Sequence, residues 1–174
     1  MLKRRSKNRA QAGAGTPLTA AEVLDRLAQI ELDGLEFYRG LLRGTRLDKV
    51  RELAQMMIEA EQRHHDRFSR YAAMARASSN PADNALTAEL PPELMRLMSD
   101  RVFISGELGE KAGQNLDERK ALRMGIKAEE NTVLLLSQLR SYVPRNRRGY
   151  IDQVIKEEQN HQDRLESLFR KYFP

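Results

Sequence analysis

Two stretches of the chain, almost one hundred residues apart, carry the same Glu-x-x-His pattern. The first is EQRH at 61–64, within IEAEQRHHDRF, and the second is EQNH at 158–161, within IKEEQNHQDRL. The two eleven-residue stretches are identical at six positions, which include the Glu and the His. Residues three apart lie on one face of a helix. A carboxylate and an imidazole on one face are ligands that suit a transition metal ion, so the repeat indicates a metal site.

The flanking apolar residues place both pairs on the inward faces of two predicted helices. Around each pair, apolar residues recur in steps of three and four, which is a helical period. They are Val50, Leu53, Met57 and Phe68 in the first helix, and Ile151, Val154, Leu165 and Leu168 in the second. Glu61 and His64 fall in register with the first set, and Glu158 and His161 fall in register with the second. Each pair therefore replaces two core residues.

Each motif is preceded by another glutamate at an apolar face. Glu31 lies 30 residues before Glu61, and Glu129 lies 29 residues before Glu158. Two other side chains remain possible ligands at this point. Glu130 also has apolar neighbours, and His65 is four residues from Glu61 and on the same helical face. We prefer Glu129, because its apolar neighbours are more complete.

Four buried carboxylates need compensating positive charge. An unpaired buried carboxylate costs several kcal/mol, whereas the stability of a whole domain is only about 5–15 kcal/mol. Two divalent cations would balance four carboxylates, and two neutral imidazoles would complete their coordination. The pattern therefore predicts a dinuclear centre with six metal ligands: Glu31, Glu61, His64, Glu129, Glu158 and His161.

The elements that must position these ligands are predicted to be four long helices. Thr19 and Glu22 have the spacing of a capping box and predict a first helix that ends at Gly44. A second helix is expected to start with Thr45 and Asp48 and to end near Ala77. A third runs from Asp117 to about 142, and Asn146 is expected to cap a fourth after the break at Pro144. The fold class predicted is all-α: a ferritin-like four-helix bundle of two helical hairpins, joined by a long crossover with a short extra helix at 92–103.

Composition narrows the function classes. The chain has 174 residues, the size of one domain, and a net charge of +5. We expect residues 1–17 to form a basic, disordered tail and residues 18–174 to form the bundle. This short basic run is not enough to indicate a nucleic-acid partner. No segment resembles a signal peptide or is long enough to span a membrane, so a cytoplasmic location is expected.

The candidate residues resemble those of the rubrerythrin branch of the ferritin-like superfamily. ELDGLEFY at 31–38 is similar to the first-helix pattern of that branch, and EQRH and EQNH are similar to its second-helix and fourth-helix patterns. The resemblance spans roughly residues 19–172. It implies two iron ions bridged by Glu61 and Glu158. Glu31 and His64 would complete one site, Glu129 and His161 would complete the other, and Tyr38 would lie near the metals.

The resemblance implies a di-iron oxidoreductase that reduces hydrogen peroxide or dioxygen, although two features depart from the pattern. Typical rubrerythrins have a rubredoxin domain with four Cys, and this chain has no Cys, so electrons are expected from a separate donor protein. They also have a further Glu where this chain has Thr132. The six ligands resemble the ferroxidase centre of bacterioferritins equally well.

Two alternatives therefore stay open. The first is a ferroxidase or iron store of the ferritin or encapsulated-ferritin type, and the second is a bundle in which the metals are only structural. Manganese suits the same ligands, and a homo-oligomer, either a dimer or larger, is expected.

Overall fold

The computed structural model describes residues 18–99 and 117–174. The predicted N-terminal tail, residues 1–17, and the last residues of the predicted extra helix lie outside the described residues.

Helix α1, Ala20–Gly44, begins at the predicted capping box. The Glu22 backbone N–H donates to the Thr19 hydroxyl over 3.2 Å, and the Thr19 N–H donates to the Glu22 carboxylate over 2.7 Å. Two backbone donors at the helix start are thereby satisfied. Both the start and the end of this helix agree with the prediction from the sequence.

Helix α2, Asp48–Ala77, begins without a side-chain cap. The expectation that Thr45 starts this helix is wrong, because Thr45 instead ends α1: its N–H donates to the Leu41 carbonyl over 2.9 Å. The Thr45 hydroxyl donates to Glu118 at the start of α5, with an oxygen–oxygen distance of 2.6 Å. This contact links the two hairpins at one end of the bundle.

Helix α5, Glu118–Leu139, and helix α6, Arg148–Tyr172, form the second hairpin. Two short helical turns connect them, η2 at Arg140–Tyr142 and η3 at Arg145–Arg147. Asn146 lies inside η3, and α6 begins after Arg147 with no side-chain cap. The prediction that Asn146 caps this helix is therefore wrong, because the η3 turn directly precedes the helix.

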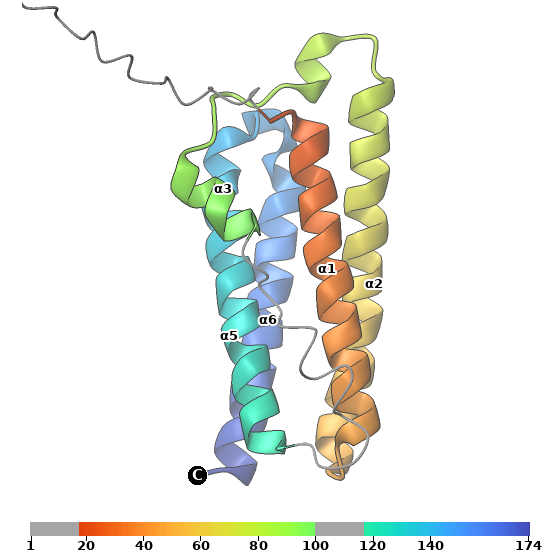
Figure 1. Ribbon diagram of the computed structural model, residues 1–174, viewed down its shortest axis with the longest axis vertical. Coiled ribbons are helices and arrows are strands. Elements are labelled where there is room, and N and C mark those ends of the chain that lie inside the picture. The colour runs from red at the N-terminus through yellow and green to blue at the C-terminus, as the bar shows by residue number, and fades with distance from the viewer. Residues whose placement is uncertain (1–17, 100–116) are drawn as a thin grey trace, which may run out of the picture.

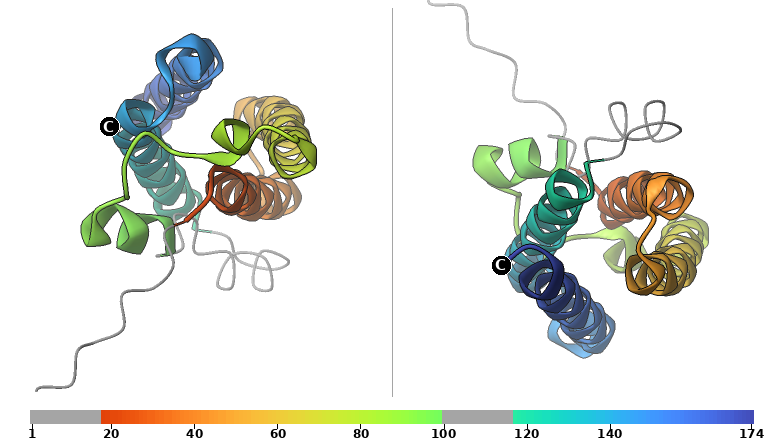
Figure 2. Two further views of the ribbon diagram at one scale, coloured as in Figure 1. Left: turned by 90° about the horizontal axis from the view of Figure 1, so that it is seen from above. Right: turned by 90° about the horizontal axis from the view of Figure 1, so that it is seen from below.

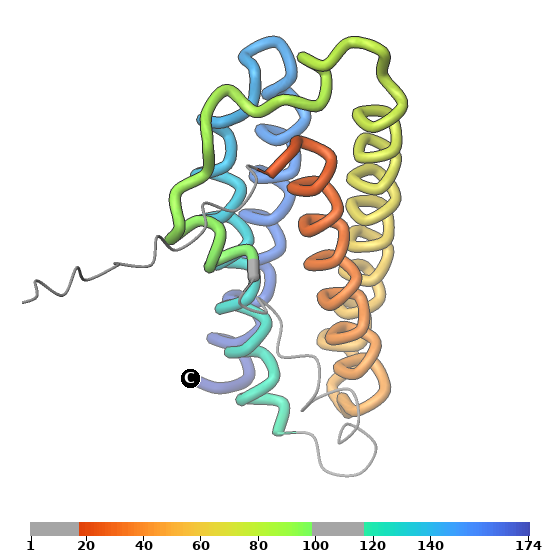
Figure 3. Tube along the Cα trace, turned by 45° about the horizontal axis from the view of Figure 1, so that its top comes forward, coloured from red at the N-terminus to blue at the C-terminus, as the bar shows by residue number. Residues whose placement is uncertain are grey.

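The first part of the crossover passes over one end of the bundle (Figures 1 and 3). It contains the short turn η1, Pro81–Asn84, and the helix α3, Pro92–Ser99. Helix α3 contacts both α1 and α5, and it buries Leu94 and Met98. The crossover is long because α2 and α5 run in the same direction, so the chain must return along the bundle between them.

Every regular element that the structure describes in residues 18–99 and 117–174 is a helix, which confirms the predicted all-α fold class. The α1–α2 and α5–α6 hairpins lie side by side, and α2 contacts α6 across them (Figures 1 and 2). The core is built from the inward faces of these helices and of α3. None of the described helices has the length and apolar character needed to cross a membrane.

Candidate metal centre

The six predicted ligands come from four different helices and meet in the core. Helices α1 and α5 each contribute one glutamate, and α2 and α6 each contribute one Glu-x-x-His pair. None of the six residues is more than 7% exposed: Glu31, Glu61, His64, Glu129, Glu158 and His161. The structure thus brings together all the residues that the sequence pattern selects.

Their donor atoms form two overlapping groups. One group is Glu31, Glu61, His64 and Glu158, and the other is Glu61, Glu129, Glu158 and His161. Within each group the four donor atoms lie within 4.8 Å of one another. Glu61 and Glu158 belong to both groups, so the geometry is that of two adjoining four-donor sites with two carboxylates in common.

In the first group, His64 approaches its neighbours with both ring nitrogens. Nδ1 lies 2.7 Å from Oε1 of Glu158 and 3.5 Å from Oε2 of Glu31. Nε2 lies 2.7 Å from Oε2 of Glu157, a carboxylate on α6 that is about one-third exposed. The ring therefore turns Nδ1 toward the cluster and Nε2 away from it.

In the second group, Nδ1 of His161 lies 2.7 Å from Oε2 of Glu158 on its own helix. Oxygens of Glu61 and Glu129 lie farther away, at 3.9 and 4.0 Å. The two imidazole rings are 6.1 Å apart, measured between their centroids. Both histidines therefore direct the same ring nitrogen toward the shared carboxylates.

Tyr38 is completely buried and donates a hydrogen bond to Oε1 of Glu129. Helix α1 reaches Glu129 on α5 in this way. Burial, together with the nearby carboxylates, raises the pKa of Tyr38 well above its ordinary value. The phenol therefore keeps its proton and acts as a donor toward Glu129 across the neutral pH range.

Glu130 and His65, the two other possible ligands, point away from the cluster. Glu130 is exposed and pairs with Lys127 over 2.8 Å. His65 uses Nδ1 to bond the backbone carbonyl of Ala28 over 2.9 Å, so this nitrogen donates and the ring is held against α1. Thr132, at the position where the resemblance implies a further Glu, is 2% exposed, and its hydroxyl has no hydrogen-bond partner.

The electrostatics of the cluster are those of crowded, buried acids. Burial is the main cause that raises the pKa values of Glu61 and Glu129 well above their ordinary range, and the neighbouring carboxylates add to the shift. Burial alone would lower the pKa of His64, but contacts with Glu158 and Glu31 outweigh it and raise this pKa to about 11. The same histidine contacts outweigh burial at Glu158 and lower its pKa.

Several buried polar atoms of the cluster have no hydrogen-bond partner among the residues that the structure describes. They are Oε1 of Glu31, Oε1 of Glu61, Nδ1 of His64 and Oε1 of Glu158. Nδ1 of His64 and Oε1 of Glu158 lie 2.7 Å apart as an ion pair. Orphaned atoms of this kind are rare in protein cores. Divalent cations would satisfy all four atoms, and oxygen and imidazole donors suit iron and manganese. The residues present therefore fit a centre for two metal ions.

Apolar side chains close the cluster along the bundle axis. Met57 and Phe68 on α2, and Val154 and Leu165 on α6, are completely buried on the flanking turns. Gly125 lies one turn before Glu129, where a Cβ atom would be 3.3 Å from Cε1 of Phe37. The glycine allows α5 to approach α1 closely near the cluster.

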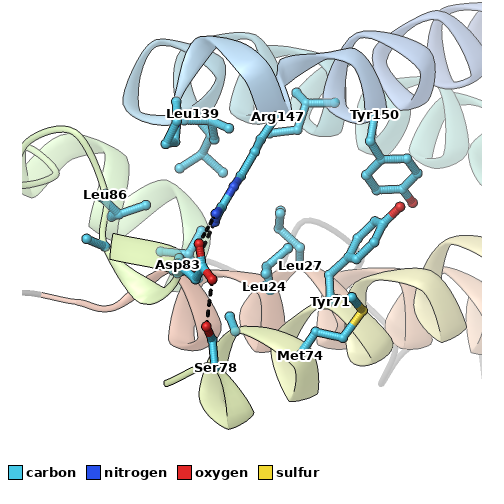
Figure 4. A pocket seen from close by; sticks show the side chains of 17 residues that line it. Leu24, Leu27, Tyr71, Met74, Ser78, Asp83, Leu86, Leu139, Arg147 and Tyr150 are labelled. Carbon is cyan, nitrogen blue, oxygen red and sulfur yellow. Dashed lines mark hydrogen bonds and ion pairs between the residues drawn. The ribbon is translucent and has the colours of Figure 1, made fainter. Parts of the chain in front are cut away.

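A separate cavity of about 560 Å³ lies at the end of the bundle near the η1 and η3 turns. Figure 4 shows Arg147 reaching across it to Asp83, which also accepts a hydrogen bond from Ser78. Its lining is largely apolar and includes Leu27, one turn before Glu31, but none of the six cluster residues. The cavity is therefore distinct from the cluster.

Sequence reasoning missed one residue of the site, Glu157. Its role depends on a contact between α6 and α2 that no pattern within one helix reveals. The only signal was its position beside Glu158, in a stretch whose counterpart in the first half has Ala60.

No protein-family model and no curated protein sequence matches the chain. Among solved structures, the chain is similar to a Thermotoga maritima protein named a candidate ferritin-like diiron-carboxylate protein. The TM-score is 0.62 at 16% sequence identity, over 88% of this chain and 96% of that chain. At this identity the likeness concerns the fold. The chain therefore has a ferritin-like fold, with a buried Glu and His cluster that fits two metal ions.

Proposed function

We propose that this protein is a di-iron oxidoreductase that reduces hydrogen peroxide or dioxygen with electrons from a separate donor protein. Glu61 and Glu158 would lie between the two ions. Glu31 and His64 would bind one ion, and Glu129 and His161 the other. The observation that carries the proposal is the pair of overlapping four-donor groups that share Glu61 and Glu158.

The charge of the cluster fits two divalent ions. Four glutamates contribute up to four negative charges, and the described residues place no Lys or Arg in an ion pair with them. One divalent ion would leave two carboxyl groups to be neutralised by protons, which their raised pKa values favour. Two ions balance the charge, and the histidines then remain neutral ligands.

Two ferrous ions at this centre would supply one electron each, and reduction of hydrogen peroxide to two water molecules takes two electrons and two protons. The printed sequence contains no Cys, and in this proposal a separate donor protein supplies the electrons. The buried apolar turns around the cluster exclude bulk water. Tyr38 holds its proton at the hydroxyl and orients Glu129.

A small substrate fits this enclosure better than an organic molecule does. The large cavity at the end of the bundle does not reach any of the six cluster residues. Dioxygen and hydrogen peroxide are small enough to pass between packed helices as the side chains move.

The proposal is tested by measuring metal content and peroxide turnover on protein purified without added metal. We expect two iron ions per chain and oxidation of the reduced protein by one equivalent of hydrogen peroxide. Glu61→Gln and Glu158→Gln should lose both, whereas Glu130→Gln, a similar change on an exposed glutamate, should retain both. Wild-type protein without bound metal, or Gln variants that still bind two ions, would contradict the proposal. Manganese in place of iron would change the metal but not the site.

A second candidate function is iron oxidation for storage, and Thr132 is the observation that favours it. Position 132 carries a threonine and not the further glutamate of the rubrerythrin pattern. The six cluster residues alone would suffice for a ferroxidase site. In this case iron is the substrate, and the protein would accumulate many ions per chain in a large assembly. Aerobic loading with ferrous iron, followed by size-exclusion measurement of mass and iron content, separates the two functions. If metal removal lowers only the melting temperature and neither activity is found, the ions are structural.

A further inference from the structure

The two halves of the cluster have equivalent ligands but different supporting residues. When the Glu-x-x-His stretches are aligned, Glu157 on α6 corresponds to Ala60 on α2. When Glu31 is aligned with Glu129, Tyr38 corresponds to Leu136. Each half therefore has one polar supporting residue that the other half lacks, and the two supporting residues differ in what they do.

Glu157 supports His64. Its Oε2 lies 2.7 Å from Nε2 of His64, and its Oε1 accepts a hydrogen bond of 2.7 Å from Gln153 on the same helix. A carboxylate that accepts the Nε2 proton fixes the ring orientation and leaves Nδ1 as the nitrogen that faces the cluster. Such a partner also makes the facing nitrogen a stronger metal donor, and its loss typically costs about 10–100-fold in metal affinity.

His161 has no such support. Ala60, the counterpart of Glu157, is a buried methyl group that cannot accept a hydrogen bond. Within residues 18–99 and 117–174, no side chain is bonded to Nε2 of His161; its bonds involve Nδ1 alone. Among the described residues, the side chains that bond the ring of His161 therefore lie only on the cluster side, and none of them strengthens its donor nitrogen.

Tyr38 has the opposite effect on the carboxylates. Its hydroxyl donates to Oε1 of Glu129, which draws negative charge away from that carboxylate and weakens it as a metal ligand. Among the described residues, Oε1 of Glu31 has no hydrogen-bond donor comparable to Tyr38. Both differences favour the same side, because Glu31 and His64 are the stronger donors and Glu129 and His161 the weaker ones.

We infer that the two metal sites have unequal affinities, with the Glu31–His64 site filling first, and that Glu157 is the positioning residue that sets this order. The inference rests on the proposed function, because it requires two ions in the cluster. It goes beyond the proposed function because it assigns the order in which the two sites bind metal. The ion at the Glu129–His161 site is then the one that exchanges more readily.

The test is a titration of the metal-free protein with Co²⁺ alone, followed by visible absorption and equilibrium dialysis. Wild-type protein should bind two ions in two steps whose dissociation constants differ by about tenfold or more. His64→Ala should abolish the tighter step and His161→Ala the weaker one. Glu157→Gln removes the charge but keeps an acceptor, and it should weaken the tighter step by about tenfold. Glu157→Ala removes the acceptor and should weaken that step more.

Tyr38→Phe should change metal affinity in the opposite direction to the Glu157 variants. It should leave the tighter step unchanged and strengthen the weaker step, because the electron pair of Glu129 Oε1 that accepts from Tyr38 becomes available to the metal ion. Glu130→Gln is the matched control and should leave both steps as in the wild type. Far-UV circular dichroism and the melting temperature of each metal-free variant show whether it is folded.

The outcomes separate this inference from the proposed function. Two bound ions with equal affinities, or a Glu157 variant that weakens both steps equally or neither, would overturn the inference and leave the proposed function intact. Failure of the folded wild type to bind Co²⁺ would overturn both.

Discussion

Replacing Glu61 by Gln should stabilise the metal-free protein at neutral pH and remove the stabilisation that metal ions provide. Glu61 is 1% exposed and lies among other carboxylates, and its pKa is raised well above the ordinary value of 4.5. Without metal, burial and the neighbouring carboxylates therefore favour the neutral form of this carboxyl. An amide has nearly the same shape and needs no proton.

The magnitude follows from the cost of keeping that proton. At pH 7 the solution lies 2.5 pH units above the ordinary pKa of 4.5, and each unit corresponds to about 1.4 kcal/mol. The metal-free wild type therefore loses at most about 3.5 kcal/mol that the Gln variant does not lose, and it reaches this limit when the folded-state pKa lies above 7. This is a large part of the stability of a domain.

The stability difference between the metal-free wild type and Glu61→Gln should depend on pH. Above pH 4.5 the unfolded chain releases the proton of Glu61, whereas the folded chain retains it up to the raised pKa. The folded state then binds more protons, so the free energy of unfolding of the wild type falls as the pH rises. The advantage of Glu61→Gln should be near zero at pH 4.5 and should grow to about 3 kcal/mol at pH 7.

The assay is urea unfolding in the presence of a chelator, at pH 4.5, 5.5 and 7, for the wild type, Glu61→Gln and the control Glu130→Gln. The titration is then repeated with excess metal ion. At one hundred times the dissociation constant, the wild type should gain about 2.7 kcal/mol for each bound ion, and Glu61→Gln should gain much less. A Gln variant that is less stable than the wild type at pH 7 without metal, or an advantage that does not change with pH, would refute the reasoning.

Three further changes should have separate effects. Tyr38→Phe removes the donor to Glu129 and should lower the metal-free stability by about 1–3 kcal/mol, since it leaves a buried oxygen unpaired; urea unfolding measures this loss, and an unchanged midpoint would contradict it. Phe68→Ala removes a completely buried ring on the turn after the cluster and should cost about 3–5 kcal/mol with or without metal; a loss seen in only one of these states would argue against a simple packing role. Thr19→Ala removes half of the capping box and should cost about 1 kcal/mol with no change in metal affinity, as thermal unfolding and a Co²⁺ titration would show.

The helices themselves could be predicted because their signals are local. The capping box of Thr19 and Glu22 involves residues within one turn, so its spacing in the sequence is also its geometry. The inward faces of the Glu-x-x-His helices follow from a period of 3.6 residues. The two wrong predictions, at Thr45 and Asn146, concern short connections. Each of these residues could cap a helix by type, but the neighbouring turn decided where the helix begins.

The choice among neighbouring polar residues was harder from sequence. Glu129 and Glu130 both have apolar neighbours, and a rotation of α5 by about 100° about its axis would exchange their environments. The structure buries Glu129 and exposes Glu130. Similarly, His65 lies on the same helix as His64, but it bonds the backbone of α1. The helical period of the apolar residues locates the buried face only to within about one residue, so it cannot choose between neighbours in sequence.

The sequence by itself determined that a buried Glu and His cluster forms, because residue type and helical period together place four carboxylates on faces that must be covered. The tertiary structure alone decided how the two halves of the cluster differ. The contacts of Glu157 with His64 and of Tyr38 with Glu129 join helices that are distant in sequence. Their existence depends on the rotation and offset of packed helices, which no pattern within a single helix specifies.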